Sequence, residues 1–381
     1  MSLGVCMLIS RFYPYLGGAE QHALRLSQTL RKKGINVFVV TENFGNLEKI
    51  ADIEGLKIYR LFSFGKGKFS SLVFMVSSLF FLIRKRKAYE IIHVHLASSP
   101  AIAAVILKKL FNKKVVVKLG GGKNIGDIDS SLKTFIGRVK LNILKKNVDK
   151  FIAISQEIKQ SMLDNSFQED KIVEIPNGVE TDKFSPLNES DRLIKREALN
   201  LTDKFVLVFA GRLEKEKNLA LFIEAFKKTL QTCSQLYLIL IGEGSELNSL
   251  TNKIQKLNIA QNVRFLGKIF DVTDFLKISD AFVLPSLSEG MPNALLEAMS
   301  CQLTVLASAV GGIKEVIRNN QEGVLFEPDN IEQMSQAILH AVNNRGWSKQ
   351  LALRARERVV RDYSLLAVSE KYLQLYHTIF K

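Results

Sequence analysis

The residues best suited to chemistry are two glutamates in the second half of the chain, one on each side of a glycine- and proline-containing turn. Glu289 precedes Gly290-Met291-Pro292, and a helix-forming run from Asn293 to Met299 carries Leu296 and Glu297. With Asn293 or a neighbour as the N-cap, backbone N–H groups at the start of this helix favour a phosphate. A carboxylate that accepts from two vicinal hydroxyls suits a ribose. The glutamate spacing alone is a weak signal, and the intervening turn makes it stronger.

A second group of charged residues follows the predicted strand Phe205–Ala210. Gly211 comes directly after this strand, and Arg212 and Lys217 lie in the segment that leads to the next helix. A guanidinium offers a bidentate donor fork and an ammonium offers a point charge, a pair suited to a diphosphate. The alternative is a solvated turn in which the cations pair with the two glutamates between them.

Three features of the first 130 residues carry weaker signals. Gly17-Gly18 opens the first helix, where small residues either allow a close backbone approach to a ligand or simply form a turn. His93 and His95 share one face of a predicted strand, but no third ligand has convincing spacing, so we expect no metal there and favour structural or substrate-contact roles. Asp127 belongs to an Asp-x-Asp pair, which often occurs by chance, and we assign it no metal.

These residues must be positioned by alternating strands and helices. Short apolar or β-branched runs alternate with amphipathic segments such as Ala19–Leu30 and Leu219–Leu230, which indicates parallel sheets covered on both faces. The predicted strands are Val5–Ile9, Asn36–Thr41, Ile91–Leu96, Val115–Leu119, Phe151–Ile154, Ile172–Ile175, Phe205–Ala210, Tyr237–Ile241, Val263–Leu266, Ala281–Pro285, Thr304–Ala307 and Val324–Phe326.

The strand series is interrupted by a polar, proline-containing stretch over residues 184–190, the best linker candidate. We therefore predict an α/β protein with two doubly wound, Rossmann-like domains, over residues 1–185 and 186–362. The last helical segment, residues 363–381, is expected to pack back on the first domain. Because ligands of such sheets bind at the carboxyl ends of the strands, facing domains predict an interdomain cleft.

Composition narrows the class of protein. The chain has 381 residues, of which 47% are hydrophobic and 24% charged, so wholesale disorder and fibrous folds are excluded. Its three cysteines are too few and too far apart for a disulfide framework or a zinc site, which favours a cytoplasmic setting. The first residues have no basic region before their apolar run, so we interpret them as a strand and not as a signal peptide.

The positive charge is concentrated in the first two-fifths of the chain. Residues 1–150 contain 26 Lys+Arg and 9 Asp+Glu, a difference of +17, whereas the remaining residues are nearly balanced. This asymmetry indicates an anionic partner, unless it only maintains solubility. The apolar segment Leu72–Ile83, followed by Arg84-Lys85-Arg86-Lys87, is too short to span a bilayer. It is either a buried helix or a helix lying in a membrane interface.

Several motifs, taken in order, resemble the retaining family-4 glycosyltransferases of the GT-B fold. They are FYPYLGGAE, IIHVHL, IPNGVETDKF, FAGRLEKEKN, LIGEGSEL, SEGMPNALLEAM and AVGGIKEVI, and they extend from about residue 10 to residue 330. The resemblance implies a nucleotide-sugar donor of the UDP or GDP type, held mainly by the second domain. It implies no cofactor and no obligatory metal.

The resemblance also assigns roles to individual residues. Arg212 and Lys217 would hold the diphosphate and stabilise the leaving group, Glu289 would contact the donor sugar, and Glu297 would bind the ribose hydroxyls. The further donor contacts would be Gly17, Gly18, Gly211, Gly290, Met291, Pro292, Asn293 and Leu296. The family commonly has a histidine in the loop after Val115–Leu119, and this chain has none there. His95, Gly121 and Asp127 are kept as candidate sugar or acceptor contacts.

The resemblance predicts a hexosyltransferase with front-side attack and retention, because no carboxylate stands out as a covalent nucleophile. The acceptor would be a saccharide or a lipid-linked sugar of cell-surface polysaccharide or glycolipid synthesis, and the enzyme would be cytoplasmic, peripheral to the inner face of an anionic membrane. The alternatives are a non-catalytic nucleotide-sugar-binding subunit, or an epimerase or phosphorylase of the same fold. No aromatic–basic motif of a nucleic-acid-binding module is present, so we expect no nucleic acid.

Overall fold

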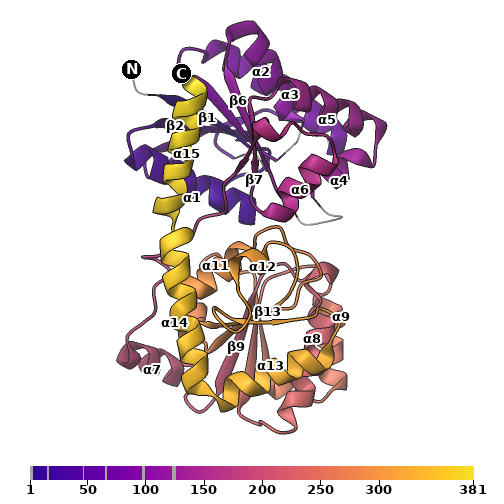
Figure 1. Ribbon diagram of the computed structural model, residues 1–381, viewed down its shortest axis with the longest axis vertical. Coiled ribbons are helices and arrows are strands. Elements are labelled where there is room, and N and C mark those ends of the chain that lie inside the picture. The colour runs from indigo at the N-terminus through magenta and orange to yellow at the C-terminus, as the bar shows by residue number, and fades with distance from the viewer. Residues whose placement is uncertain (1–2, 15–16, 46, 65–66, 97–98, 122–125) are drawn as a thin grey trace. The chain divides into compact units, whose positions relative to one another are not determined.

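The computed structural model describes residues 3–14, 17–45, 47–64, 67–96, 99–121 and 126–381. It divides the chain into a first unit, residues 1–178 with 365–381, and a second unit, residues 179–364 (Figure 1). The expected boundary between residues 185 and 186 lies a few residues beyond the observed one. Phe184 explains the difference, because its ring is buried and its carbonyl accepts from Arg356 of the second unit.

The first unit is built on an eight-stranded sheet. All neighbouring strands are parallel except β3 and β4, which form an antiparallel hairpin at one edge. In spatial order the strands are β3 (Ile50–Ile53), β4 (Leu56–Leu61), β2 (Asn36–Glu42), β1 (Gly4–Leu8), β5 (Ile91–His95), β6 (Lys114–Leu119), β7 (Lys150–Ala153) and β8 (Ile172–Glu174). Its helices are α1 (Gly18–Lys32), α2 (Gly67–Arg84), α3 (Pro100–Phe111), α4 (Asp127–Leu132), α5 (Phe135–Asn147), α6 (Gln156–Asp164) and α15 (Leu365–Phe380).

The continuous apolar runs form the central strands, as predicted, because parallel strands covered on both faces bury every side chain. The hairpin of β3 and β4 was not predicted. Its edge strand is short, with Ile50 exposed, and so lacks an apolar run. The turn between the two strands uses Glu54 and Gly55, both with positive φ, as two-residue hairpin turns require.

Helix α15 completes the core of the first unit, although the rest of this unit ends near residue 178. Val368, Tyr372, Tyr376 and Ile379 are buried in the same cluster as the apolar face of α1. The apolar residues of α15 recur at helical spacing, which places them on one side of the helix. The sequence therefore returns to its first unit to finish the core.

The second unit contains a six-stranded parallel sheet. In spatial order the strands are β11 (Val263–Gly267), β10 (Leu236–Ile241), β9 (Phe205–Ala210), β12 (Ala281–Leu284), β13 (Thr304–Ser308) and β14 (Val324–Phe326). All six correspond to predicted strands. The helices are α7 (Glu189–Glu197), α8 (Leu219–Leu230), α9 (Leu247–Lys256), α10 (Thr273–Ile278), α11 (Asn293–Ser300), α12 (Ile313–Val316), α13 (Ile331–Asn343) and α14 (Arg345–Asp362).

Both sheets reverse their strand order at one point. In the second unit the chain builds outward from β9 through β10 to β11, then returns to place β12 on the other side of β9. In the first unit the corresponding neighbours are β1 and β5. Loops diverge at the carboxyl ends of such strands, where doubly wound sheets bind their ligands.

Candidate functional site

The loops after β9 and β12 meet at the switch point of the second sheet. The amide N of Leu287 donates to the carbonyl of Glu216 at 2.8 Å, which ties the two loops together. The loop after β9 carries Arg212 and Lys217, and the loop after β12 carries Glu289. Residues from two separate motifs of the sequence are therefore brought to one place.

Lys217 and Glu289 form a mostly buried ion pair at this point. The Nζ of Lys217 lies 2.6 Å from Oε1 of Glu289, and the two side chains are only 14% and 10% exposed. The hydroxyl of Ser286 donates to the same carboxylate oxygen at 2.7 Å. Because the pair is largely shielded from water, its charges act strongly on any anion or polar ligand that reaches them.

Helix α11 begins at Asn293, after the three-residue turn that follows Glu289, with Pro292 at its N-cap position and no side-chain cap hydrogen bond from that residue. Proline has no side-chain oxygen, so the N-cap residue itself cannot accept from the first turn, and a helix start of this kind favours an anion. Gly290, Met291, Leu296 and Glu297 are all buried. Glu297 lies in the second turn of the helix, as its spacing from the turn predicted.

Arg212 lies on the same loop as Lys217 but does not join the ion pair. Its Nη2 lies 2.8 Å from Oε1 of Glu216, and its side chain is 70% exposed. The sequence interpretation placed Arg212 and Lys217 together on one diphosphate. The structure brings Lys217 to Glu289 and leaves Arg212 at the surface, because a nearer carboxylate on its own loop is available.

Glycines let the loops after β9 and β10 pack backbone against backbone. Gly242 has φ +144°, and a Cβ there would lie 1.8 Å from the carbonyl oxygen of Gly211. A Cβ on Gly244 would lie 2.2 Å from the carbonyl oxygen of Leu213. These close approaches fix the course of the loop that ends in Lys217.

The first unit presents Gly17 and Gly18 after β1, beside its own switch point. The amide N of Gly17 donates to Oε2 of Glu20 at 2.9 Å, which gives α1 one half of a capping box. A carboxylate of the chain thus occupies the start of this helix. The two glycines remain candidate contacts, with Glu20 as a competitor for any anion.

A buried polar cluster lies in the first unit, between the central strands β5 and β6 and helix α1. The Nζ of Lys118 on β6 donates to Oδ1 of Asn177 at 2.8 Å and lies 3.1 Å from Nδ1 of His22 on α1. His95 on β5 is 2% exposed, and its ring stacks on His93 with centroids 4.4 Å apart. His93 in turn contacts the hydroxyl of Tyr376 on α15 at 2.7 Å.

Burial controls the charges of this cluster. It lowers the pKa of Lys118 to about 7. Burial, and then the charge of Lys118, lower the pKa of His95 to about 3, and the pKa values of His22 and His93 also lie well below their usual range. Within the described chain, Nε2 of each of the three histidines has no hydrogen-bond partner. Sequence reasoning missed His22 and Asn177, although a histidine on the apolar face of α1 was a signal.

The remaining candidates of the first unit lie in the loop after β6. The carboxylate of Asp127 accepts from the amide N of Gly120 at 2.9 Å and so closes the base of this loop. Gly121 is exposed and has φ +85°, whereas Gly122 and Lys123 lie outside the described residues. Asp127 is therefore engaged within the loop, and His95 is directed into the core. In the described parts of the chain, no group of three or more His, Cys, Asp or Glu side chains could hold a metal ion.

Two family profiles match the chain. The profile "Glycosyltransferase Family 4" matches residues 16–183, and "Glycosyl transferases group 1" matches residues 191–358. A similar protein of Escherichia coli, UDP-Gal:alpha-D-GlcNAc-diphosphoundecaprenol alpha-1,3-galactosyltransferase, is 27% identical over 379 residues, 95% of this chain and 94% of that one. The GPI3 subunit of the Saccharomyces cerevisiae phosphatidylinositol N-acetylglucosaminyltransferase is 27% identical over 390 residues, 100% of this chain and 84% of that one.

Solved structures share the fold. Anabaena HepE in complex with UDP and glucose superposes with a TM-score of 0.83 at 18% identity, over 99% of this chain and 100% of that one. Sucrose-phosphate synthase of Thermosynechococcus elongatus has a TM-score of 0.83 at 21% identity, over 99% of each chain. The two doubly wound units of the described chain are those of the GT-B fold.

Proposed function

Because the chain belongs to the family-4 glycosyltransferases, we propose that it transfers a hexose-type sugar from a nucleotide-sugar donor to a saccharide or lipid-linked acceptor. The observation that carries this proposal is the buried pair of Lys217 and Glu289 at the switch point of the second sheet. The pair lies where a doubly wound sheet binds its ligand, and Glu289 belongs to the loop that leads to the start of α11.

The second unit would hold the donor. Lys217 and the first-turn N–H groups of α11 would supply positive charge for the diphosphate, and the exposed Arg212 would leave Glu216 to reach it. Glu289 then contacts the donor sugar, and Glu297 accepts from the ribose hydroxyls. A UDP-type donor is favoured, since HepE binds UDP and the Escherichia coli relative is named for a UDP sugar.

Retention and metal independence form the finer part of the proposal. Negative charge builds on the diphosphate as the sugar leaves, and Lys217, Arg212 and the helix start can meet this charge without a metal ion. Glu289 is held by Lys217 and Ser286, which suits a sugar contact better than a covalent nucleophile. The proposed reaction is therefore a front-side attack by the acceptor hydroxyl on the donor carbon, with the proton passing to the leaving phosphate.

Calorimetric titration with UDP, GDP and ADP tests the donor site. We expect UDP to bind, and Glu297→Ala and Lys217→Ala each to weaken it by about 1–3 kcal/mol, the usual loss when a buried hydrogen-bond partner is removed. The exposed Glu197 of α7 provides a matched control, since Glu197→Ala should leave the affinity unchanged. If none of the nucleotides binds, or if Glu297→Ala binds UDP as tightly as the unaltered chain, the proposed site is wrong. Release of UDP on sugar transfer separates a transferase from a non-catalytic subunit, an epimerase or a phosphorylase.

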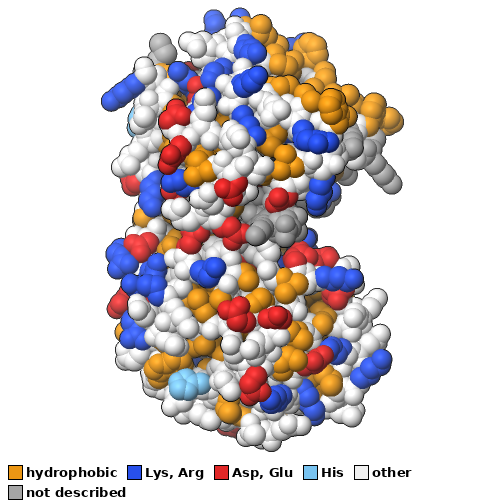
Figure 2. Space-filling model, turned by 45° about the vertical axis from the view of Figure 1, so that its right-hand side comes forward, with side chains coloured by type: hydrophobic (Ala, Val, Ile, Leu, Met, Phe, Trp, Pro, Cys, Tyr) orange, Lys and Arg blue, Asp and Glu red, His pale blue; other side chains and the backbone are white. Residues whose placement is uncertain are grey.

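The first unit carries a surface suited to a membrane. On α2, Phe69, Leu72, Val76 and Phe80 are 57%, 50%, 41% and 65% exposed and follow one helical stripe, while the opposite stripe is buried. On α5, Phe135 and Ile136 are exposed beyond 70%, and Figure 2 shows hydrophobic side chains gathered over this part of the first unit. Such contiguous exposed apolar surface marks an interaction site.

Basic residues accompany this surface. Exposed cations lie on the neighbouring elements: Lys109 on α3, Lys133 between α4 and α5, and Arg138 on α5. A further basic run, Lys85-Arg86-Lys87, directly follows α2. An apolar stripe beside a basic cluster matches a helix that lies in the interface of an anionic membrane. No helix among the described residues is long and apolar enough to cross one. We propose a peripheral association with the cytoplasmic face of the cell membrane, where a lipid-linked acceptor would be presented.

Flotation with anionic and neutral liposomes tests the membrane surface. At low salt the protein should float with phosphatidylglycerol-containing vesicles. The double variant, with Phe69→Asp and Phe80→Asp together, should not float, because each charge would have to enter the apolar layer of the membrane. The control is Ile194→Asp on α7, an equally exposed apolar residue of the second unit. Absence of flotation at low salt, or equal flotation of both variants, would rule out this surface.

A further inference from the structure

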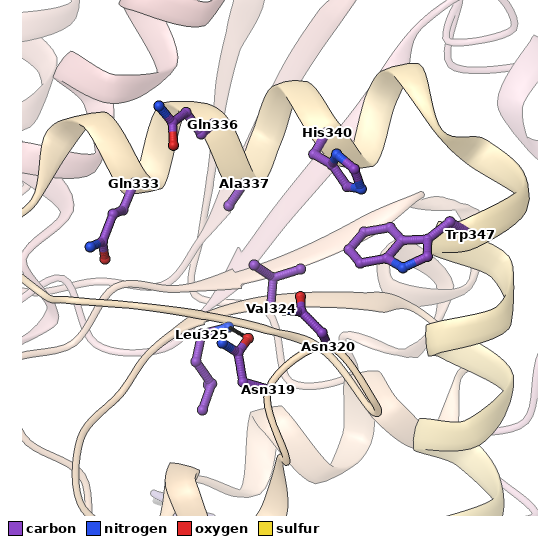
Figure 3. A pocket seen from close by; sticks show the side chains of 9 residues that line it. All are labelled: Asn319, Asn320, Val324, Leu325, Gln333, Gln336, Ala337, His340 and Trp347. Atoms are coloured by element: carbon purple, nitrogen blue, oxygen red, sulfur yellow. Dashed lines mark hydrogen bonds between the residues drawn. The ribbon is translucent and has the colours of Figure 1, made fainter.

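A pocket with a volume of about 590 Å³ lies on the second unit, apart from the loops of Lys217 and Glu289. Helix α13 forms one wall with Gln333 and Gln336, and the turn before β14 forms the facing wall with Asn319 and Asn320 (Figure 3). Trp347, at the start of α14, closes one end beside His340. We refer to this feature as the α13–β14 pocket.

The pocket lies along β14 at the edge of the sheet, and its Trp347 end lies away from the candidate donor site. The hydroxyl of Thr304, the first residue of β13, donates to the carbonyl of Ser348, which directly follows Trp347. The start of α14 is therefore fixed at the amino ends of the strands, whereas Lys217 and Glu289 follow their carboxyl ends. The pocket is a separate site of the same unit.

The lining is neutral and rich in hydrogen-bonding groups. None of its nine residues is Asp, Glu, Lys or Arg, although these make up 24% of the chain, and four are Asn or Gln. Oδ1 of Asn319 accepts from the amide N of Leu325 at 2.9 Å, and Oε1 of Gln333 accepts from the amide N of Glu327 at 2.8 Å. These bonds hold the two amide groups so that each keeps its NH₂ as a donor with no partner among the described residues.

The remaining lining is apolar or aromatic. Val324, Leu325 and Ala337 provide apolar contacts, and Trp347 is partly exposed. The indole ring is held in a T-shaped contact with His340, with centroids 4.3 Å apart, and its N–H has no partner within the described part of the chain. A fixed aromatic ring next to amide donors presents an apolar face and polar edges together.

We propose that the α13–β14 pocket binds a neutral saccharide. A sugar ring carries hydroxyl groups at its edge and C–H groups on its faces, which match the amides and the indole respectively. A phosphate or carboxylate ligand would find no cation in the lining to offset its desolvation. This inference goes beyond the proposed function, because it needs no donor and gives the chain a second, non-catalytic hold on a glycan.

The only tryptophan of the chain lies in this pocket, so its fluorescence reports ligand binding directly. The probes are triacetylchitotriose, mannotriose and maltotriose at millimolar concentration, with inorganic phosphate as the charged comparison. We expect a saturable change in Trp347 emission with at least one trisaccharide and none with phosphate. Asn320→Gly and Gln333→Leu should each weaken that saccharide about tenfold, the size of one lost hydrogen bond.

The variants are chosen to keep the fold. Asn320 has φ +60°, a conformation that glycine adopts without strain, and Gln333 is exposed on α13. Gln255→Leu, at an exposed position of α9, should leave the affinity unchanged. No emission change with all three trisaccharides overturns the inference, as does a change that neither pocket variant weakens. Glu297→Ala should weaken UDP binding and preserve the saccharide response, so the proposed donor site and the pocket can be tested independently.

Discussion

Two cations of the candidate donor site differ in burial, and burial decides how strongly each charge can act on a ligand. Lys217 and Arg212 are both cations on one loop, but Lys217 is 14% exposed and faces Glu289, whereas Arg212 is 70% exposed and faces Glu216. A buried charge keeps most of its electrostatic strength, and an exposed one loses most of it to solvent. Lys217 is therefore the residue on which we expect donor binding to depend more strongly.

Lys118 predicts a pH dependence of stability in the first unit. Its pKa is about 7 in the folded chain and 10.5 in the unfolded chain, so between these values the unfolded chain binds more protons. Stability should rise with pH across this window, by at most about 1.4 kcal/mol per pH unit, and should level off below about pH 7, where Lys118 is protonated in both states. Lys118→Met should flatten this rise.

Thermal unfolding followed by circular dichroism from pH 7 to 9 measures this effect. Trp347 fluorescence reports the unfolding of the second unit. A transition seen by circular dichroism but not by this fluorescence therefore belongs to the first unit. The control is Lys114→Met, a less buried lysine at the start of the same strand, which should keep the slope. An unchanged slope in Lys118→Met would show that Lys118 is charged in the folded unit.

The sequence predicted which residues gather at the candidate donor site, but not all their contacts. Glu289, Glu297 and Lys217 could be found because each belongs to a local pattern, a turn or loop after a strand. For Arg212 the sequence left two partners open, a phosphate or a glutamate of its own loop, because the choice depends on side-chain torsions; the structure has the pair with Glu216. The cluster of Lys118, His22 and Asn177 was also out of reach, since its members come from separate elements joined only in the folded unit.

At the scale of elements, apolar runs predicted the central strands. The sequence did not predict which face of α2 is buried and which is exposed. The segment Leu72–Ile83 is apolar nearly all round, so its pattern does not say which side is buried. Packing decides this, because Phe74, Ser78 and Leu82 turn inward while Phe80 remains exposed. Helix α2 is therefore not fully buried: one apolar stripe packs inward, and the other is exposed in the described part of the chain.

Gly242 is the element-scale position with the sharpest expected effect. Gly242→Ala would bring Cβ to 1.8 Å from the carbonyl oxygen of Gly211 and would strain a backbone at φ +144°. We expect a loss of at least about 2–3 kcal/mol in the stability of the second unit, because the backbone of the loop after β9 or β10 would have to move. Gly346→Ala is the control, since nothing lies within 4 Å and the residue is helical, so stability should rise slightly. Equal melting temperatures of the two variants would contradict the packing described.

At the scale of the whole molecule, α15 predicts an unequal response to truncation. Ending the chain after Ser364 removes Val368, Tyr372, Tyr376 and Ile379 from the core of the first unit. Each buried side chain of this size contributes about 1.5–3 kcal/mol, so the loss is comparable to the stability of a domain.

We expect the first unit of the truncated chain to unfold while Trp347 still shows a cooperative transition of the second. Circular dichroism and limited proteolysis measure the first effect, and fluorescence the second. Leu366→Ser, at a residue of α15 that is 62% exposed, is the control and should change neither unit. A truncated first unit that still melts cooperatively would mean that α15 is dispensable.

The chain passes from the first unit to the second at residues 178 and 179 and returns at 364 and 365. The second unit is thus inserted within the first, and its own ends are joined by a hydrogen bond from Val179 to Tyr363. On the ribosome, a helix needed for the first core emerges only after the whole second unit has been synthesised. The unit that begins first is therefore completed last, and its unfinished apolar core must be protected while its neighbour folds.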